Sequence, residues 1–243
     1  MIKGLYTSAS SMLHRFGKQE VAANNLANIN TTGYKRDGFF QRALVEAGQS
    51  LSGSYHPEWR SKDPVEVIVD FSQGPLKQTD GALDVAIQGD GFFTIQTPDG
   101  ERYTRNGSFK LDRDGVLTTQ TGYPVLGEGG TIMLQGADVK INEKGALLVD
   151  GLLVDALDIR DFERPYRMMK VAGEFFLPKD GDQGQPSENM AVYQGFLEES
   201  NVNSTMEMTE MLIVYRNYES DQRAVQMQDE TLRKAVNELG AVR

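Results

Sequence analysis

The sequence lacks most of the residues on which enzymatic and metal-binding chemistry depends. It contains no cysteine, which excludes disulfides, thiolate nucleophiles and thiolate metal ligands. Its only histidines are His14 and His56, and no histidine pair has the spacing of a zinc site. We therefore expect no catalytic residue, no cofactor and no metal ion, and we expect that the protein is not an enzyme.

Positive charge and long apolar runs are also scarce. The formal net charge is −10, whereas a nucleic-acid-binding surface needs clustered Lys and Arg, so we expect no nucleic-acid partner. No apolar run approaches the roughly 20 residues that span a bilayer, so we expect no membrane insertion. The first eleven residues lack the basic and then apolar order of a secretory signal peptide. Export from the cytoplasm would therefore need another route.

Each end of the chain instead carries a heptad pattern. Apolar side chains recur there at alternating spacings of three and four residues, which turns one narrow face of a helix towards a partner helix. Polar members of the pattern, Gln19, Gln222 and Asp229, would fix its register. We call these rows the predicted seam and expect assembly through Leu5, Met12, Phe16, Leu26, Met208, Met211, Tyr215, Val225, Leu232, Val236 and Leu239.

The two ends differ in charge. Residues 1–36 hold five basic and one acidic side chain, a net charge of +4, and residues 196–243 hold five basic and nine acidic ones, a net charge of −4. Opposite charges suit the two ends to pairing, within one chain or between neighbouring copies. Two amphipathic helices that fold onto their own domain are the alternative, because ordinary core helices show the same spacing.

Short strands separated by turns fill the middle of the chain. Pro98–Gly100, Asn106–Gly107 and Asp112–Gly115 are typical of hairpin turns, and such even spacing favours an all-β module. We therefore expect an α+β fold in which N- and C-terminal helices pair as a coiled coil around an inserted all-β domain. A fragment of about residues 37–195 should fold alone. The expected parts are a seam helix at 1–36, a connecting segment with a short strand at 37–79, a β-rich domain at 80–195 and a second seam helix at 196–243.

Six stretches, in order along the chain, carry a resemblance to a known family: Ala22–Asn28, Thr31–Lys35, Leu83–Ile87, Gly89–Phe93, Tyr103–Gly107 and Gly195–Asn203. Together they resemble the bacterial flagellar basal-body rod and hook protein family. Tyr215 departs from that resemblance, because the family more often has Gln before Arg216.

The resemblance implies a structural subunit of the flagellar rod, the axial drive shaft of the basal body. In this family the terminal helices form an inner coiled-coil tube and the β-rich domain faces outward. The implied partners are copies of the chain, other flagellar rod proteins and the flagellar type III export apparatus, which exports such subunits without a cleaved signal. Tyr123–Gly130 is similar to the proximal-rod type. The alternatives are a distal-rod member, or a soluble β-domain binding module that its helices dimerise.

Overall fold

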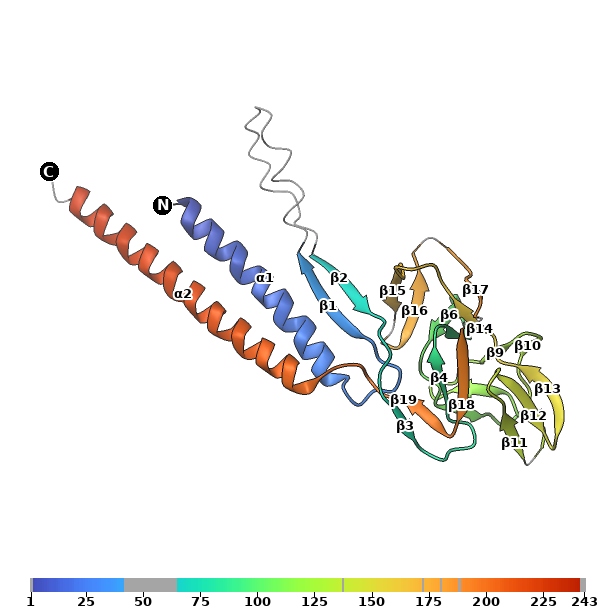
Figure 1. The fold of residues 1–243 in the computed structure, drawn as a ribbon. Coiled ribbons are helices and arrows are strands. Elements are labelled where there is room, and N and C mark those ends of the chain that lie inside the picture. The colour runs from blue at the N-terminus through green and yellow to red at the C-terminus, as the bar shows by residue number, and fades with distance from the viewer. Residues whose placement is uncertain are drawn as a thin grey trace. The chain divides into compact units, whose positions relative to one another are not determined.

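The computed structural model describes residues 2–41, 65–136, 138–171, 173–179, 181–187 and 189–240, and residues 42–64 of the expected connecting segment lie outside these ranges. The chain forms two compact units (Figure 1). The helical unit contains the described residues within 1–27, 37–68 and 203–243, and the strand-rich unit contains those within 28–36 and 69–202. The unit boundaries thus differ from those expected at residues 36 and 195. The reason is that residues 28–36 and 196–202 pack within the strand-rich unit.

Two antiparallel helices make up most of the helical unit. They are α1, Ile2–Ala27, and α2, Ser204–Gly240. Asn203 caps α2, because its side-chain oxygen accepts a hydrogen bond from the N–H of Met206 at 3.1 Å. After α1 the chain turns, and Gly33 takes a φ of 67°, in the left-handed region that glycine adopts without strain. The Asn- and Gly-containing stretch after Ala27 therefore ends the helix, nine residues before the end of the seam helix expected at 1–36.

The strand-rich unit is built from antiparallel strands (Figure 1). Its largest sheet has six strands in the order β15 (Met168–Val171), β16 (Phe175–Pro178), β6 (Gly100–Thr104), β5 (Phe92–Thr97), β14 (Ile159–Asp161) and β17 (Gln185–Pro186). A three-stranded sheet contains β11 (Val139–Ile141), β12 (Ala146–Val149) and β13 (Leu152–Ala156).

The remaining strands form two-stranded sheets. The sequence-distant pairs are β4 (Val85–Gly89) with β18 (Met190–Gln194), and β3 (Leu76–Gln78) with β19 (Phe196–Glu198). The other pairs are β7 (Phe109–Leu111) with β8 (Leu117–Thr119), β9 (Leu126–Gly127) with β10 (Gly130–Thr131), and β1 (Arg36–Gln41) with β2 (Val65–Asp70).

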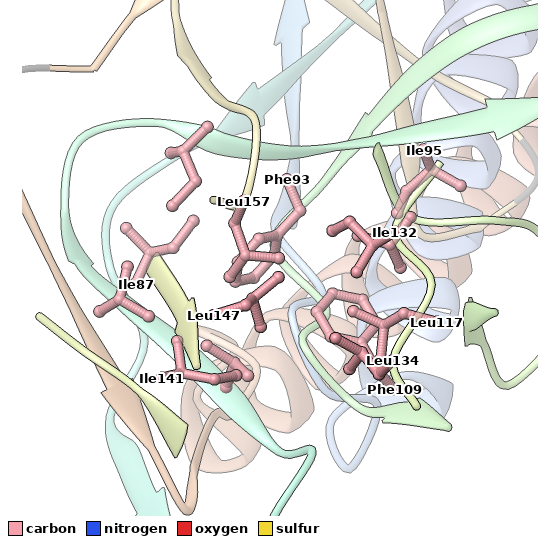
Figure 2. Close-up of a cluster of buried hydrophobic side chains, with 14 of the residues drawn as sticks. Ile87, Phe93, Ile95, Phe109, Leu117, Ile132, Leu134, Ile141, Leu147 and Leu157 are labelled. Carbon is pink, nitrogen blue, oxygen red and sulfur yellow. The ribbon is translucent and has the colours of Figure 1, made fainter. Parts of the chain in front are cut away.

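The six-stranded sheet is covered by apolar side chains on both faces. Successive residues of a strand point to opposite faces, so the doublet Phe92–Phe93 serves two clusters. Phe93 belongs to the larger cluster, which Figure 2 shows around Ile87, Leu117, Leu147 and Leu157. Phe92 belongs to an aromatic cluster with these members: Tyr103, Phe162, Met168 and Phe176. The α+β class is confirmed as two terminal helices and a strand-rich middle.

One predicted hairpin is wrong. Asn106–Gly107 lies between β6 and β7, but β6 pairs with β5 and β7 pairs with β8. The segment instead crosses from one sheet to another, where the carbonyl of Gly107 accepts the N–H of Val85 at 3.0 Å. The other two turns do join paired strands, as expected.

Candidate assembly surface

Within the chain, α1 and α2 meet through polar side chains. Arg15 Nε lies 2.5 Å from Asp221 Oδ2, which also accepts a hydrogen bond from Ser11 Oγ at 3.1 Å. Lys18 Nζ lies 2.5 Å from Glu210 Oε1. We call these five residues the contact row. The opposite charges noted at the two ends of the sequence thus meet inside one chain.

The contact row continues into the most buried side chains of each helix. On α1, Arg15 and Lys18 are followed at spacings of four and three by Ala22 and Asn25, which are both buried. On α2, buried Glu207 and Val214 flank Glu210 at the same spacings. Each row therefore follows a heptad pattern, one residue before the corresponding members of the predicted seam.

That offset of one residue turns much of the predicted seam away from the intrachain contact, because adjacent residues on a helix are separated by about 100°. Phe16 is 63% exposed, Met208 51% and Tyr215 53%. Met12, Leu26, Met211, Val225 and Leu232 are partly buried, and the side chains of Leu5, Val236 and Leu239 lie outside the described part.

Further large apolar side chains are exposed on the same helices. They are not confined to the predicted seam, so the apolar surface is wider than the heptad pattern indicates. Large apolar side chains that are exposed together on neighbouring helices favour an interaction surface. These additional residues are Leu13, Met206, Leu212, Ile213 and Met227.

The polar seam members have modest roles within the single chain. Gln19 is partly buried and Gln222 is exposed. Asp229 forms an exposed ion pair with Arg233 of its own helix at 3.8 Å. Isolated pairs of this kind contribute little stability, and this one lies within a single helix, so it does not hold α1 against α2.

The described part of the chain offers little for catalysis. Within it, no group of three or more His, Asp or Glu side chains is placed to hold a metal ion. A hollow of about 350 Å³ beside Phe162 and Met168 is bordered by charged residues. One of these, Arg164, is already paired with Asp90. Of the helices that the structure describes, none is long and apolar enough to cross a membrane.

The contact row predicts a rescue by charge exchange. Asp221→Arg should place two cations together and lower the stability of the helix pair by about 1 kcal/mol. Adding Arg15→Asp to this variant should restore most of the loss, because the pair is then re-formed with its charges exchanged. Thermal unfolding followed by the circular dichroism signal of the helices measures the loss in the single variant and the recovery in the double variant. Asp229→Arg is the control, since its partner lies on the same helix. A double variant no more stable than Asp221→Arg would show that the pair does not join α1 to α2.

The architecture defines a class of chain in which both termini form one helix pair and a strand-rich unit is inserted between them. Family models match all three parts. "Flagella basal body rod protein" matches residues 5–35, "Flagellar hook protein FlgE/F/G D1 domain" residues 86–149, and "Flagellar basal body rod FlgEFG protein C-terminal" residues 193–238.

Full-length relatives agree with these matches. The chain is 33% identical to the flagellar basal-body rod protein FlgF of Caulobacter vibrioides and 32% identical to that of Rhizobium meliloti, with 100% of each chain covered. It is 32% identical to the flagellar basal-body rod protein FlgG of Bacillus subtilis, with 98% of this chain and 99% of the relative covered. The chain belongs to the flagellar basal-body rod and hook protein family.

Proposed function

We propose that this chain is a structural subunit of the flagellar basal-body rod and that it has no enzymatic activity. One observation carries the assembly role: α1 and α2 use polar side chains for their own contact and leave Phe16, Met208 and Tyr215 exposed. Apolar rows with heptad spacing on exposed helices suit coiled-coil contacts with the helices of neighbouring subunits. We expect these contacts to join subunits head to tail. Head-to-tail contacts generate an open helical array when the rotation from one subunit to the next does not close into a ring.

The assignment to the proximal rod belongs to the same proposal. It rests on the similarity of Tyr123–Gly130 to the proximal-rod type and on full coverage of two FlgF relatives. The FlgG relative has nearly the same identity, so identity alone does not separate the two positions in the rod. The partners are copies of this chain, other rod proteins and the flagellar type III export apparatus, which would export it without cleaving a signal. The proposal includes no nucleic-acid partner and no membrane insertion.

Introducing a charge at an exposed residue of the predicted seam tests the assembly role. Phe16→Asp or Tyr215→Asp should abolish motility in cells that carry no other copy, because an unpaired charge buried in a helix contact costs several kcal/mol. The melting temperature of each purified variant should stay close to that of the unmodified protein, since both side chains are exposed in the single chain. Motility and the amount of protein in purified basal bodies are the two measurements.

Two variants serve as matched controls. Phe16→Leu keeps an apolar side chain, and Ser220→Asp adds the same charge at an exposed position of α2 on a different face from Tyr215. Both should support motility. Normal incorporation of Phe16→Asp and Tyr215→Asp would refute assembly through these rows. A protein that forms only discrete soluble dimers at all concentrations would instead favour a dimerised binding module.

A further inference from the structure

Four distant stretches of the chain meet at one buried carboxylate in the strand-rich unit. Glu198 Oε1 lies 2.6 Å from Lys35 Nζ and accepts a hydrogen bond from the N–H of Gly74 at 2.9 Å. Glu198 Oε2 lies 3.5 Å from Arg105 Nη1. All three charged side chains are at most 4% exposed. We call Lys35, Arg105 and Glu198 the junction cluster.

The backbones around the cluster are equally close. The N–H of Gly33 donates to the carbonyl of Glu198 at 2.8 Å. A Cβ at Gly33 would lie 2.3 Å from the backbone nitrogen of Asn106, and one at Gly74 would lie 2.0 Å from the carbonyl oxygen of Glu199. Real Cβ atoms do not approach so closely, so only glycine allows these segments to pack backbone against backbone.

Further bonds hold residues 28–36, which follow the N-terminal helical segment, and residues 196–202, which precede the C-terminal one. We call these two segments the two crossings. The N–H of Arg36 donates to Asn201 Oδ1 at 2.7 Å, which joins the crossings directly. Lys170 Nζ donates to the carbonyl of Lys35 at 2.7 Å and lies 3.8 Å from the centre of the Tyr34 ring. The crossings are thus fastened to each other and to the adjacent sheet.

The charges of the cluster are not balanced, because two cations share one carboxylate. Burial lowers the pKa of Lys35, and the attraction of Glu198 offsets part of that effect. Arg105 is also bound by the carbonyl of Gly89 at 2.8 Å. Breaking a buried ion pair by removing one partner is costly even where the intact pair adds little net stability. Glu198 is the single anion of this cluster, and both crossings therefore depend on it.

We infer that Glu198 locks the two crossings together as one cooperative element that opens separately from the apolar core of the strand-rich unit. Glu198 itself lies in β19. Its bonds reach Lys35 in the first crossing, Gly74 shortly before β3, and Arg105 directly after β6. The core clusters around Phe93 and Phe92 are built from apolar side chains, and the junction cluster reaches them through Arg105, whose guanidinium carbon lies 5.0 Å from the centre of the Phe92 ring. Such a lock holds the two crossings side by side within the strand-rich unit. It acts within one chain, so it does not depend on the proposed assembly.

Hydrogen exchange on the full-length protein tests the lock. Glu198→Gln should accelerate exchange of the amides of Gly33, Arg36 and Glu199 by at least about 100-fold, because two buried cations lose their counterion. Lys35→Met should accelerate exchange of the same three amides by at least about 10-fold. The effect is smaller because this variant removes one charged bond and leaves the pair of Arg105 with Glu198. Acceleration at Glu199 is the informative result, because that amide lies in the other crossing. Amides of β5 and β6 should keep their slow exchange in both variants.

The neighbouring pair Lys77–Glu199 provides matched controls. Its atoms lie 3.3 Å apart, but its side chains are 65% and 44% exposed. Glu199→Gln and Lys77→Met should therefore leave exchange at Gly33 and Arg36 unchanged. Faster exchange at only one crossing, unchanged exchange, equal acceleration in β5 and β6, or failure of Glu198→Gln to fold would each overturn the inference.

Discussion

A fragment of residues 37–195 is expected to melt about 6–20 °C below a fragment of residues 28–202. The shorter fragment lacks Lys35 and Glu198 and leaves Arg105 without its carboxylate. It also lacks β19, so β3 loses its paired strand. Leaving Arg105 buried without its carboxylate costs about 3–5 kcal/mol, and a domain of this size loses about 2–4 °C per kcal/mol.

The two fragments separate three outcomes by circular dichroism. A lower but cooperative transition for residues 37–195 would show that the core folds alone, as the sequence predicts, and that the two crossings stabilise it. Equal melting temperatures would mean that the crossings add no stability. A shorter fragment with no cooperative transition would mean that residues 28–36 and 196–202 belong to the core itself.

Gly107→Ala should lower the stability of the strand-rich unit by more than about 3 kcal/mol, which corresponds to a fall in melting temperature of about 10 °C. A Cβ at this position would lie 1.7 Å from the carbonyl oxygen of Val85 and 3.1 Å from Phe93 Cε2. The Val85 carbonyl belongs to the backbone of β4, so it cannot move aside as a flexible side chain would. The new methyl group must therefore push two sheets apart.

Gly151→Ala is the matched control for that substitution. Gly151 has a φ of 82°, but a Cβ there would meet no atom within 4 Å. Its replacement should cost only the strain of a left-handed backbone, about 1–2 kcal/mol. Chemical denaturation of both variants gives the two values. A Gly107→Ala protein as stable as Gly151→Ala would show that the β6–β7 crossing has room to adjust.

The presence of a helix at each end could be predicted from the heptad pattern, but the face that each helix uses within the chain could not. A heptad pattern identifies an apolar row and indicates that it faces another helix. It does not say whether that helix belongs to the same chain. Here Arg15 and Asp221 take the intrachain contact, and Phe16, one residue later, is exposed. The opposite charges of the two ends were the sequence signal for this contact.

The junction cluster shows a different limit. Lys35 and Glu198 are separated by 163 positions, and each alone resembles a solvated surface charge. The sequence shows glycines close to Arg105 and Lys35, namely Gly107 and Gly33. Glycine next to a polar residue more often indicates a turn, which is what the sequence predicts for Asn106–Gly107. Only the pairing of strands that are distant in sequence, such as β3 with β19, brings these residues together.

The two crossings also have a mechanical consequence. A single polypeptide strand rotates readily about its φ and ψ dihedrals and therefore transmits pulling forces but little torque. Two strands bridged side by side behave differently, because twisting one around the other first strains the bonds between them. Those bonds include Arg36 to Asn201 and Lys35 to Glu198. Within the strand-rich unit, residues 28–36 and 196–202 thus resist twisting against each other more than two unbridged strands would.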